Sequence, residues 1–143
     1  VQSRVSVLVI GAVLGTIHGD SASAVRERVV SDLGVAPSSF SATDLVVTCA
    51  RDGDTRHVAA IEEVRGADGD TSFVSLFERI DRELRSSGVL DRGDSAVFER
   101  LRAGEESYED LRTTIEERAV RFDRLATAGL TGPDDRNRET QRR

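Results

Sequence analysis

The chain has 143 residues, of which 38% are hydrophobic, 4% aromatic and 32% charged; 26 acidic against 20 basic residues give a formal net charge of −6. This length accommodates one domain or a part of a larger one, and the acidic balance argues against a nucleic-acid or anionic-membrane surface, which would need a basic stripe. All 20 basic residues are arginine, which excludes a P-loop lysine and a catalytic lysine. An acidic, lysine-free composition is what we expect of an extreme halophile, with a GC-rich genome as the alternative explanation.

The first apolar stretch, residues 5–17, is too short to span a membrane. With Arg4 before it and Ala22-Ser23-Ala24 behind it, the stretch is similar to a secretory signal peptide. A buried strand over Val13–His18 explains the same residues equally well. The sequence begins at Val1 and contains no methionine, so we expect either an unusual start codon or a piece of a longer protein.

The residues after this stretch predict a helix that begins near Ala22. Asp20 and Ser21 can cap it, because their side-chain oxygens accept hydrogen bonds from free N–H groups of a first turn. Gly34 is placed to end it at a positive φ angle. The apolar face recurs every four residues, at Val25, Val29 and Leu33.

Residues 44–79 predict an antiparallel meander. Two apolar runs, 45–50 and 57–64, flank an Asp52-Gly53 turn, and a third strand begins near Phe73. Cys49 is the only cysteine, which excludes an internal disulfide and a cysteine-based metal cluster. Because Cys49 follows an aliphatic run, we expect it to be a small buried residue.

The last third predicts helices. A short helix is expected around residues 96–101, and a longer one follows a Ser107 cap and ends near Gly129. We expect Thr131–Arg143 to be disordered, since it is polar and interrupted by proline. The apolar face of the longer helix consists of Tyr108, Leu111, Ile115, Ala119, Phe122 and Leu125.

Thr16, His18 and Asp20 are the sharpest candidates for chemistry. They lie where an apolar strand would give way to a helix N-terminus, which offers free N–H groups and a positive dipole end to an anion. A histidine there can donate to a phosphate oxygen. The alternative is a surface histidine followed by an ordinary aspartate cap.

The strings VLGTIHGDSASAVRERVVSDLGV, SFSATDLVVTCA and RHVAAIEEV resemble the archaeal type II/IV secretion system ATPases that power pilus, archaellum and secretion machines. The match begins at the "His box" of that family, here Gly15, Thr16 and His18. It continues through a helix with Arg26 and Arg28 and a strand pair that covers Asp44–Thr48 and Ile61–Val64. Looser similarities follow at Leu76-Phe77, Ser107-Tyr108 with Leu111, and Ile115-Glu116-x-Arg118.

The resemblance implies an α/β fold, the C-terminal portion of a RecA-like core followed by a small helical tail. It assigns residues 1–12 to an unmatched apolar N-terminus, 13–80 to a partial core, 81–130 to a helical region and 131–143 to a disordered tail. His18 would contact the γ-phosphate side of a nucleotide, with Thr16 and Asp20 shaping its loop. Arg26 and Arg28 would assist a phosphate or a subunit contact, although a solvated helix face is the favoured explanation for both.

In that family the cofactors are ATP and Mg²⁺, and the partners are the other subunits of a hexameric ring and a polytopic membrane platform protein. Such motors are cytoplasmic and reach the membrane through the secretion machine. No GxxxxGK[ST] motif or Walker B strand precedes the His box here, and phosphoryl transfer depends on both. We therefore expect a C-terminal fragment that does not hydrolyse ATP or bind nucleotide tightly alone. The alternatives are a small stand-alone α+β binding or regulatory protein and a secreted protein with residues 1–24 as its signal.

Overall fold

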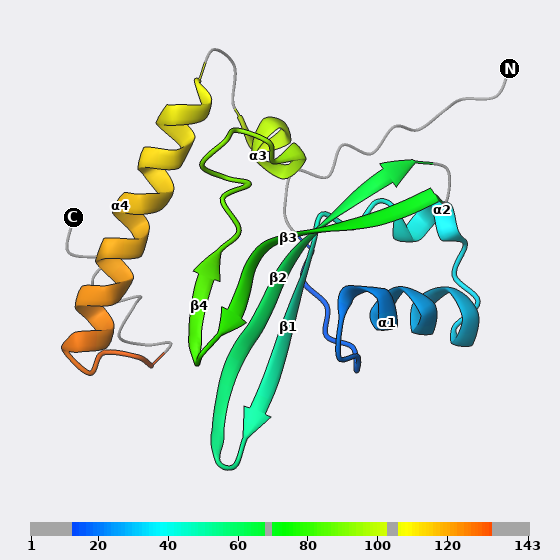
Figure 1. Ribbon diagram of the computed structural model, residues 1–143, viewed down its shortest axis with the longest axis horizontal. Helices are drawn as coiled ribbons and strands as arrows, with labels where there is room; N and C mark the ends of the chain where they lie inside the picture. Colours follow the sequence, from blue (N-terminus) through cyan, green and yellow to red (C-terminus); the bar gives the residue numbers. More distant parts are fainter. Residues whose placement is uncertain (1–12, 68–69, 103–105, 133–143) are drawn as a thin grey trace, which may run out of the picture.

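The computed structural model describes residues 13–67, 70–102 and 106–132, which form a mixed α/β fold (Figure 1). Its sheet has the order β1-β2-β3-β4 with every neighbouring pair antiparallel, so the predicted meander is confirmed. The strands are β1 (Leu45–Asp52), β2 (Thr55–Ala67), β3 (Asp70–Ile80) and β4 (Glu83–Ser86). The helices are α1 (Ala22–Glu27) with its π-helical continuation η1 (Arg28–Asp32), α2 (Pro37–Phe40), α3 (Ala96–Leu101) and α4 (Tyr108–Thr127).

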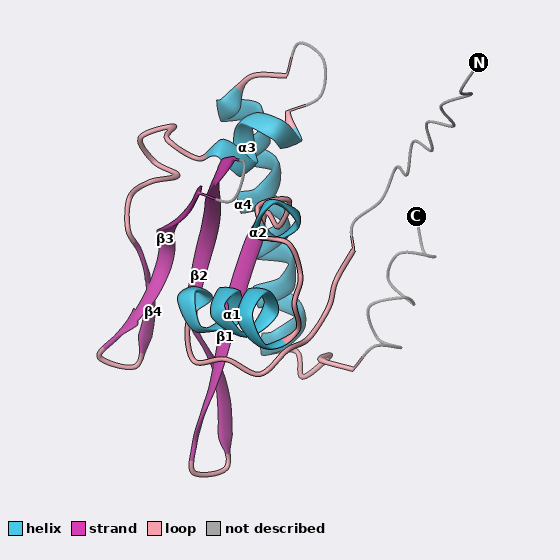
Figure 2. Cartoon of the chain, turned by 90° about the vertical axis from the view of Figure 1, so that its right-hand side faces the viewer, coloured by secondary structure: helices cyan, strands magenta, loops and turns pink. Residues whose placement is uncertain are grey.

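Helices lie on both sides of the sheet. In Figure 1, α1 and α2 are on one side and α3 and α4 on the other, and Figure 2 shows α1 in front of β1 with α4 behind the sheet. On the α1 side, the ring of Phe40 meets that of Phe73 edge-on, with centroids 6.4 Å apart. On the other side, the rings of Phe98 and Tyr108 join α3 to α4 at 5.4 Å. The ring of Phe40 thus attaches α2 to β3, whereas α4 is attached to α3.

The predicted helix after residue 21 is confirmed. The Ser21 hydroxyl accepts a hydrogen bond from the Ala24 amide, as an N-cap does. Gly34 has φ +68°, the left-handed conformation that ends a helix at low cost for glycine. The π-helical turns of η1, which the apolar spacing did not predict, widen the helix from Arg28 onward.

Of the two short hairpin turns, the sequence predicts the one between β1 and β2 but not the one between β3 and β4. Gly53 has φ +58° between β1 and β2, and Arg51 braces this turn with hydrogen bonds to the Gly53 carbonyl and Asp54 carboxylate. Between β3 and β4, Asp81 and Arg82 both have positive φ angles, although neither is glycine. The fourth strand was not predicted, because its turn lacks the glycine or asparagine that marks such turns.

Helix α4 has the predicted ends but does not bury the predicted face. Ser107 and Asp110 form a reciprocal capping box, and Gly129 follows the helix with φ +72°. Of its six expected core positions only Leu125 is buried, while Ile115 and Phe122 are exposed. The apolar stripe is therefore largely open to solvent.

Two expectations about buried segments are wrong. Residues 13–19 form no strand, and Val13 is 94% exposed; an apolar run becomes a strand only where a neighbour satisfies its backbone groups, and the described part of the sheet offers none to this segment. Cys49 is exposed, because it alternates with Thr48 along β1 and Thr48 takes the buried position. The first half of the proposed signal sequence, residues 1–12, and nearly all of the expected disordered tail, residues 133–143, lie outside the described residues.

The same change, phenylalanine to alanine, made at a buried and at an exposed position tests this arrangement of the core. Phe40 is 3% exposed and Phe122 is 56% exposed, so Phe40→Ala should lower the free energy of unfolding by about 3–5 kcal/mol. Phe122→Ala should lower it by less than about 1 kcal/mol. Urea unfolding of both variants measures the difference, and equal losses would mean that Phe122 is also buried.

Candidate functional site

Residues 15–20, which we call the His-box loop, run as an irregular segment into α1. The three candidates on it, Thr16, His18 and Asp20, are all exposed. Gly19 packs against the first turn of the helix: a Cβ atom at this position would lie 2.6 Å from Cγ2 of Val25. The structure thus gathers the three candidate side chains on one solvent-facing loop that folds over the start of α1.

The N-terminus of α1, the predicted anion-binding position, already has a carboxylate from the sheet. The Ala22 amide donates to Oε2 of Glu62 at 3.0 Å, and the Ala24 amide donates to the Ser21 hydroxyl at 3.2 Å. These acceptors satisfy donors that would otherwise be free for a phosphate. Ser21 rather than Asp20 is the capping residue, and the sequence did not indicate Glu62.

The two candidate arginines lie further along the same helical segment. Arg26 belongs to α1 and is half-buried, whereas Arg28 begins η1 and is exposed. They therefore occupy the helix rather than the loop that carries His18. Arg28 fits the expectation of a solvated helix face better than Arg26 does.

Glu63 is the most enclosed charged side chain of the described structure, with 0% exposure. Its carboxylate lies against the start of α3, where the Ser95 hydroxyl donates to it at 2.5 Å. Three further donors complete its shell: Arg65 Nε at 2.6 Å, Val97 N at 3.0 Å and Ala96 N at 3.1 Å. The carboxylate is therefore an internal cap of α3, supplied by β2.

The surroundings of Glu63 act on its pKa in opposite directions. Burial raises the pKa, because it penalises the charged form. The hydrogen bonds donated by Ser95, Val97, Arg65 and Ala96 stabilise the carboxylate and outweigh this effect, so the pKa lies below the ordinary glutamate value. Glu63 is thus held ionised, as a structural anion requires and a general acid does not.

Tyr108, at the start of α4, lies close to this cluster. Burial raises the pKa of its hydroxyl, the Ser95 backbone acts in the opposite direction, and the negative charges of Glu63, Asp94 and Glu99 raise the pKa further. Tyr108 therefore stays neutral, and its ring packs on Phe98. Nothing in this arrangement activates the hydroxyl as a nucleophile or base.

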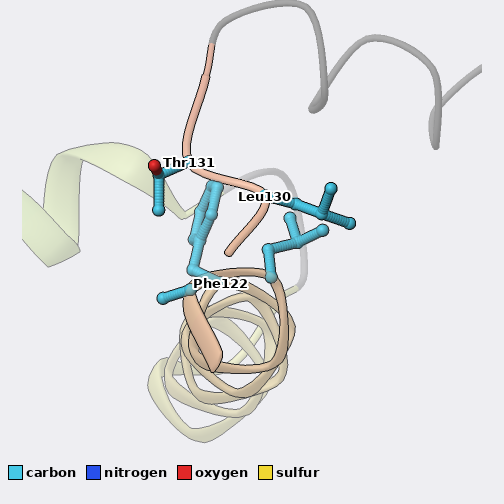
Figure 3. Close-up of a pocket in the computed structure, with 5 residues that line it drawn as sticks. Phe122, Leu130 and Thr131 are labelled. Carbon is cyan, nitrogen blue, oxygen red and sulfur yellow. The ribbon is translucent and has the colours of Figure 1, made fainter. Parts of the chain in front are cut away.

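A small cavity of about 190 Å³ lies at the far end of α4, on the opposite side of the sheet from the His-box loop (Figures 1 and 3). Its lining is apolar apart from one hydroxyl: Phe122, Leu125, Ala126, Leu130 and Thr131. It contains no titratable side chain and therefore lacks acid–base groups of its own. Figure 3 shows Phe122 and Leu130 flanking it.

Neither a metal centre nor a membrane span is found in the part of the chain that the structure describes. Its histidine, cysteine, aspartate and glutamate side chains form no group of three or more that could hold a metal ion. None of its helices is long and apolar enough to cross a bilayer. No family model, curated protein or solved structure matches the chain.

The sequence predicts the strand that carries Glu63 but not the role of this residue. Ile61–Val64 is predicted only as a strand ending that is similar to the family, and Ser95 has no predicted role. The available signal was an acidic residue in an apolar strand, together with a serine directly before a helix. Which carboxylate meets which helix depends on tertiary packing over 32 residues of separation.

Replacing Glu63 by glutamine tests the internal cap. At neutral pH, Glu63→Gln should lower the free energy of unfolding by about 2–3 kcal/mol, because an amide cannot accept from all the donors that face the carboxylate. A lowered folded-state pKa contributes stability above the unfolded-state pKa, and this is lost as pH falls through the folded-state value. The difference between wild type and variant should therefore shrink below about pH 4.

Chemical unfolding between pH 3 and 8 measures this difference. The matched control is Glu78→Gln on β3, an exposed position whose change should stay within about 0.5 kcal/mol. A deficit of Glu63→Gln that is the same at every pH would contradict the assignment of an ionised cap.

Proposed function

We propose that this chain is a C-terminal segment of an archaeal type II/IV secretion ATPase, in which it supplies the His-box loop and the elements that follow. The observation that carries the proposal is the continuous pattern over residues 13–64: Gly15, Thr16 and His18, then an arginine-bearing helix, then an aliphatic strand pair ending in Ile61–Val64. The RecA-like origin of this part of the fold belongs to the same proposal.

The order of the described elements supports it. An exposed loop with His18 is followed by α1 with Arg26, and then by the β1–β2 pair, in which Glu63 and Val64 of β2 are buried. This is the order that the resemblance implies after the His box. The strand expected over Val13–His18, which includes the His box, is not formed, so the element order supports the proposal only from the loop onward.

In this function His18 contacts the γ-phosphate side of bound ATP, while Thr16 and Asp20 shape its loop. All three are exposed, so they are accessible to a nucleotide whose phosphates and Mg²⁺ are held by other residues. Arg26 and Arg28 assist a phosphate or a neighbouring subunit. The chain has no lysine and therefore no P-loop lysine, so the P-loop and Walker B residues must come from elsewhere in the motor. The other subunits of the ring and a membrane platform protein are its partners.

A stand-alone binding protein is the second candidate, and the exposed apolar stripe of α4 favours it. Ile115 and Phe122 of this stripe are exposed, and exposed apolar patches on a folded chain often mark a docking surface. A secreted protein fits less well, because cleavage after Ala24 would remove the Ser21 cap and the first turn of α1, including the fully buried Ala22.

The functional test mixes this chain with the separately produced nucleotide-binding half of an archaeal type II/IV secretion ATPase. We expect no ATP turnover by the chain alone, and turnover once both parts are present. Loss of one preorganised phosphate contact costs on the order of 10²-fold in kcat, so His18→Ala should lower turnover by about that factor.

The control is His57→Ala, which changes the other histidine, in the β1–β2 hairpin, and should leave turnover unchanged. Turnover by the chain alone, or turnover of the mixture that is insensitive to His18→Ala, would contradict the proposed function. Binding of the chain to a partner without any nucleotide effect would favour the stand-alone binding protein.

A further inference from the structure

Glu62 joins the sheet to the start of α1. Its Oε2 accepts a hydrogen bond from the Ala22 amide at 3.0 Å, between residues 40 positions apart. Ala22 is fully buried and directly follows the capping residue Ser21. We propose that Glu62 is the positioning residue of the His-box loop: it fixes the first turn of α1 on the sheet, and this turn fixes the loop.

The His-box loop is held to the first turn of α1 by close packing. Gly19 lies so near Val25 that a Cβ atom would come within 2.6 Å of its Cγ2 atom. Gly19 therefore packs directly on the first turn of α1. Since this turn is tied to β2 through Glu62, we expect the orientation of the loop to follow the position of β2.

The charge of Glu62 suits this role. A carboxylate at a helix N-terminus interacts favourably with the positive end of the helix dipole as well as with the amide that it accepts from. Glu62 is only half-buried, so it keeps part of its hydration and avoids the full penalty of an enclosed charge. Glu62 and Glu63 belong to the same strand, but Glu62 contacts α1 on one side of the sheet and Glu63 contacts α3 on the other.

This inference rests on the proposed function for its biological meaning, because the loop carries the proposed phosphate contact, His18. Glu62 contacts a backbone amide, so it acts through the loop and is not itself a catalytic residue. The positional claim can be tested without any nucleotide.

The test is amide hydrogen exchange of the whole chain, measured for peptides that cover residues 13–25, 45–64 and 96–102. In Glu62→Ala we expect exchange in 13–25 to accelerate roughly tenfold or more, the size expected for a lost hydrogen bond to a charged group. Glu62→Gln keeps an acceptor oxygen and should recover most of the protection. The matched control, Glu78→Ala on β3, should change none of the three peptides.

Two outcomes would overturn the positioning role: unchanged exchange of residues 13–25 in Glu62→Ala, or loss of protection in 45–64 to the same extent, which would indicate general destabilisation. ATP turnover in the mixture with the nucleotide-binding half is measured on the same variants. One further result separates the two proposals: Glu62→Ala accelerates exchange of residues 13–25, but neither Glu62→Ala nor His18→Ala alters turnover. This result would support the positioning role and refute the proposed function. Lower turnover with unchanged exchange would again refute the positioning role.

Discussion

The buried carboxylate of Glu63 is the constraint on which the packing of the C-terminal half depends. A charge with no solvent exposure is tolerated only when donors surround it. β2 supplies only one of these donors, the Arg65 side chain, because its backbone amides are used in pairing with β1 and β3. The start of α3 supplies the others, since the amides of a first helical turn have no partner within the helix. The position of α3 and the burial of Glu63 therefore depend on each other. β2 positions the carboxylate, and the N-terminus of α3 stabilises its charge by hydrogen bonds.

Glu62 repeats this arrangement on the opposite side of the sheet with a weaker enclosure. Consecutive strand residues point to opposite faces, so Glu62 meets the amide of Ala22 while Glu63 meets those of Ala96 and Val97. One dipeptide thus attaches a helix to each face. The irregular register between Ile61 and Glu62 lies directly beside this dipeptide, where the strand pairing with β3 shifts by one residue.

Local signals predicted most of the elements, because they act within a few residues. The Asp52-Gly53 turn, the Ser21 and Ser107 caps, and the glycines after α1–η1 and α4 all work through their own backbone neighbourhood. Contacts between elements that are distant in the sequence could not be predicted from such local signals. An apolar run at Val13–His18 predicts a strand only if a partner strand exists, and the stripe of α4 predicts burial only if a surface covers it. The pairing of Glu63 with Ser95 likewise depends on how β2 and α3 meet.

Contacts already made at the N-terminus of α1 limit what the His-box loop and this helix end can contribute to phosphate binding. A helix N-terminus usually binds an anion through its free amides, but here Glu62 and Ser21 already accept from the amides of Ala22 and Ala24. A phosphate brought to this place would meet a carboxylate as well as a helix end, and the negative charges would repel each other. Among the side chains of the loop, the imidazole of His18 is the one that can donate a hydrogen bond to a phosphate from a ring nitrogen. Any role of this site in nucleotide binding consequently depends on phosphate ligands supplied from outside the loop and the first turn of α1.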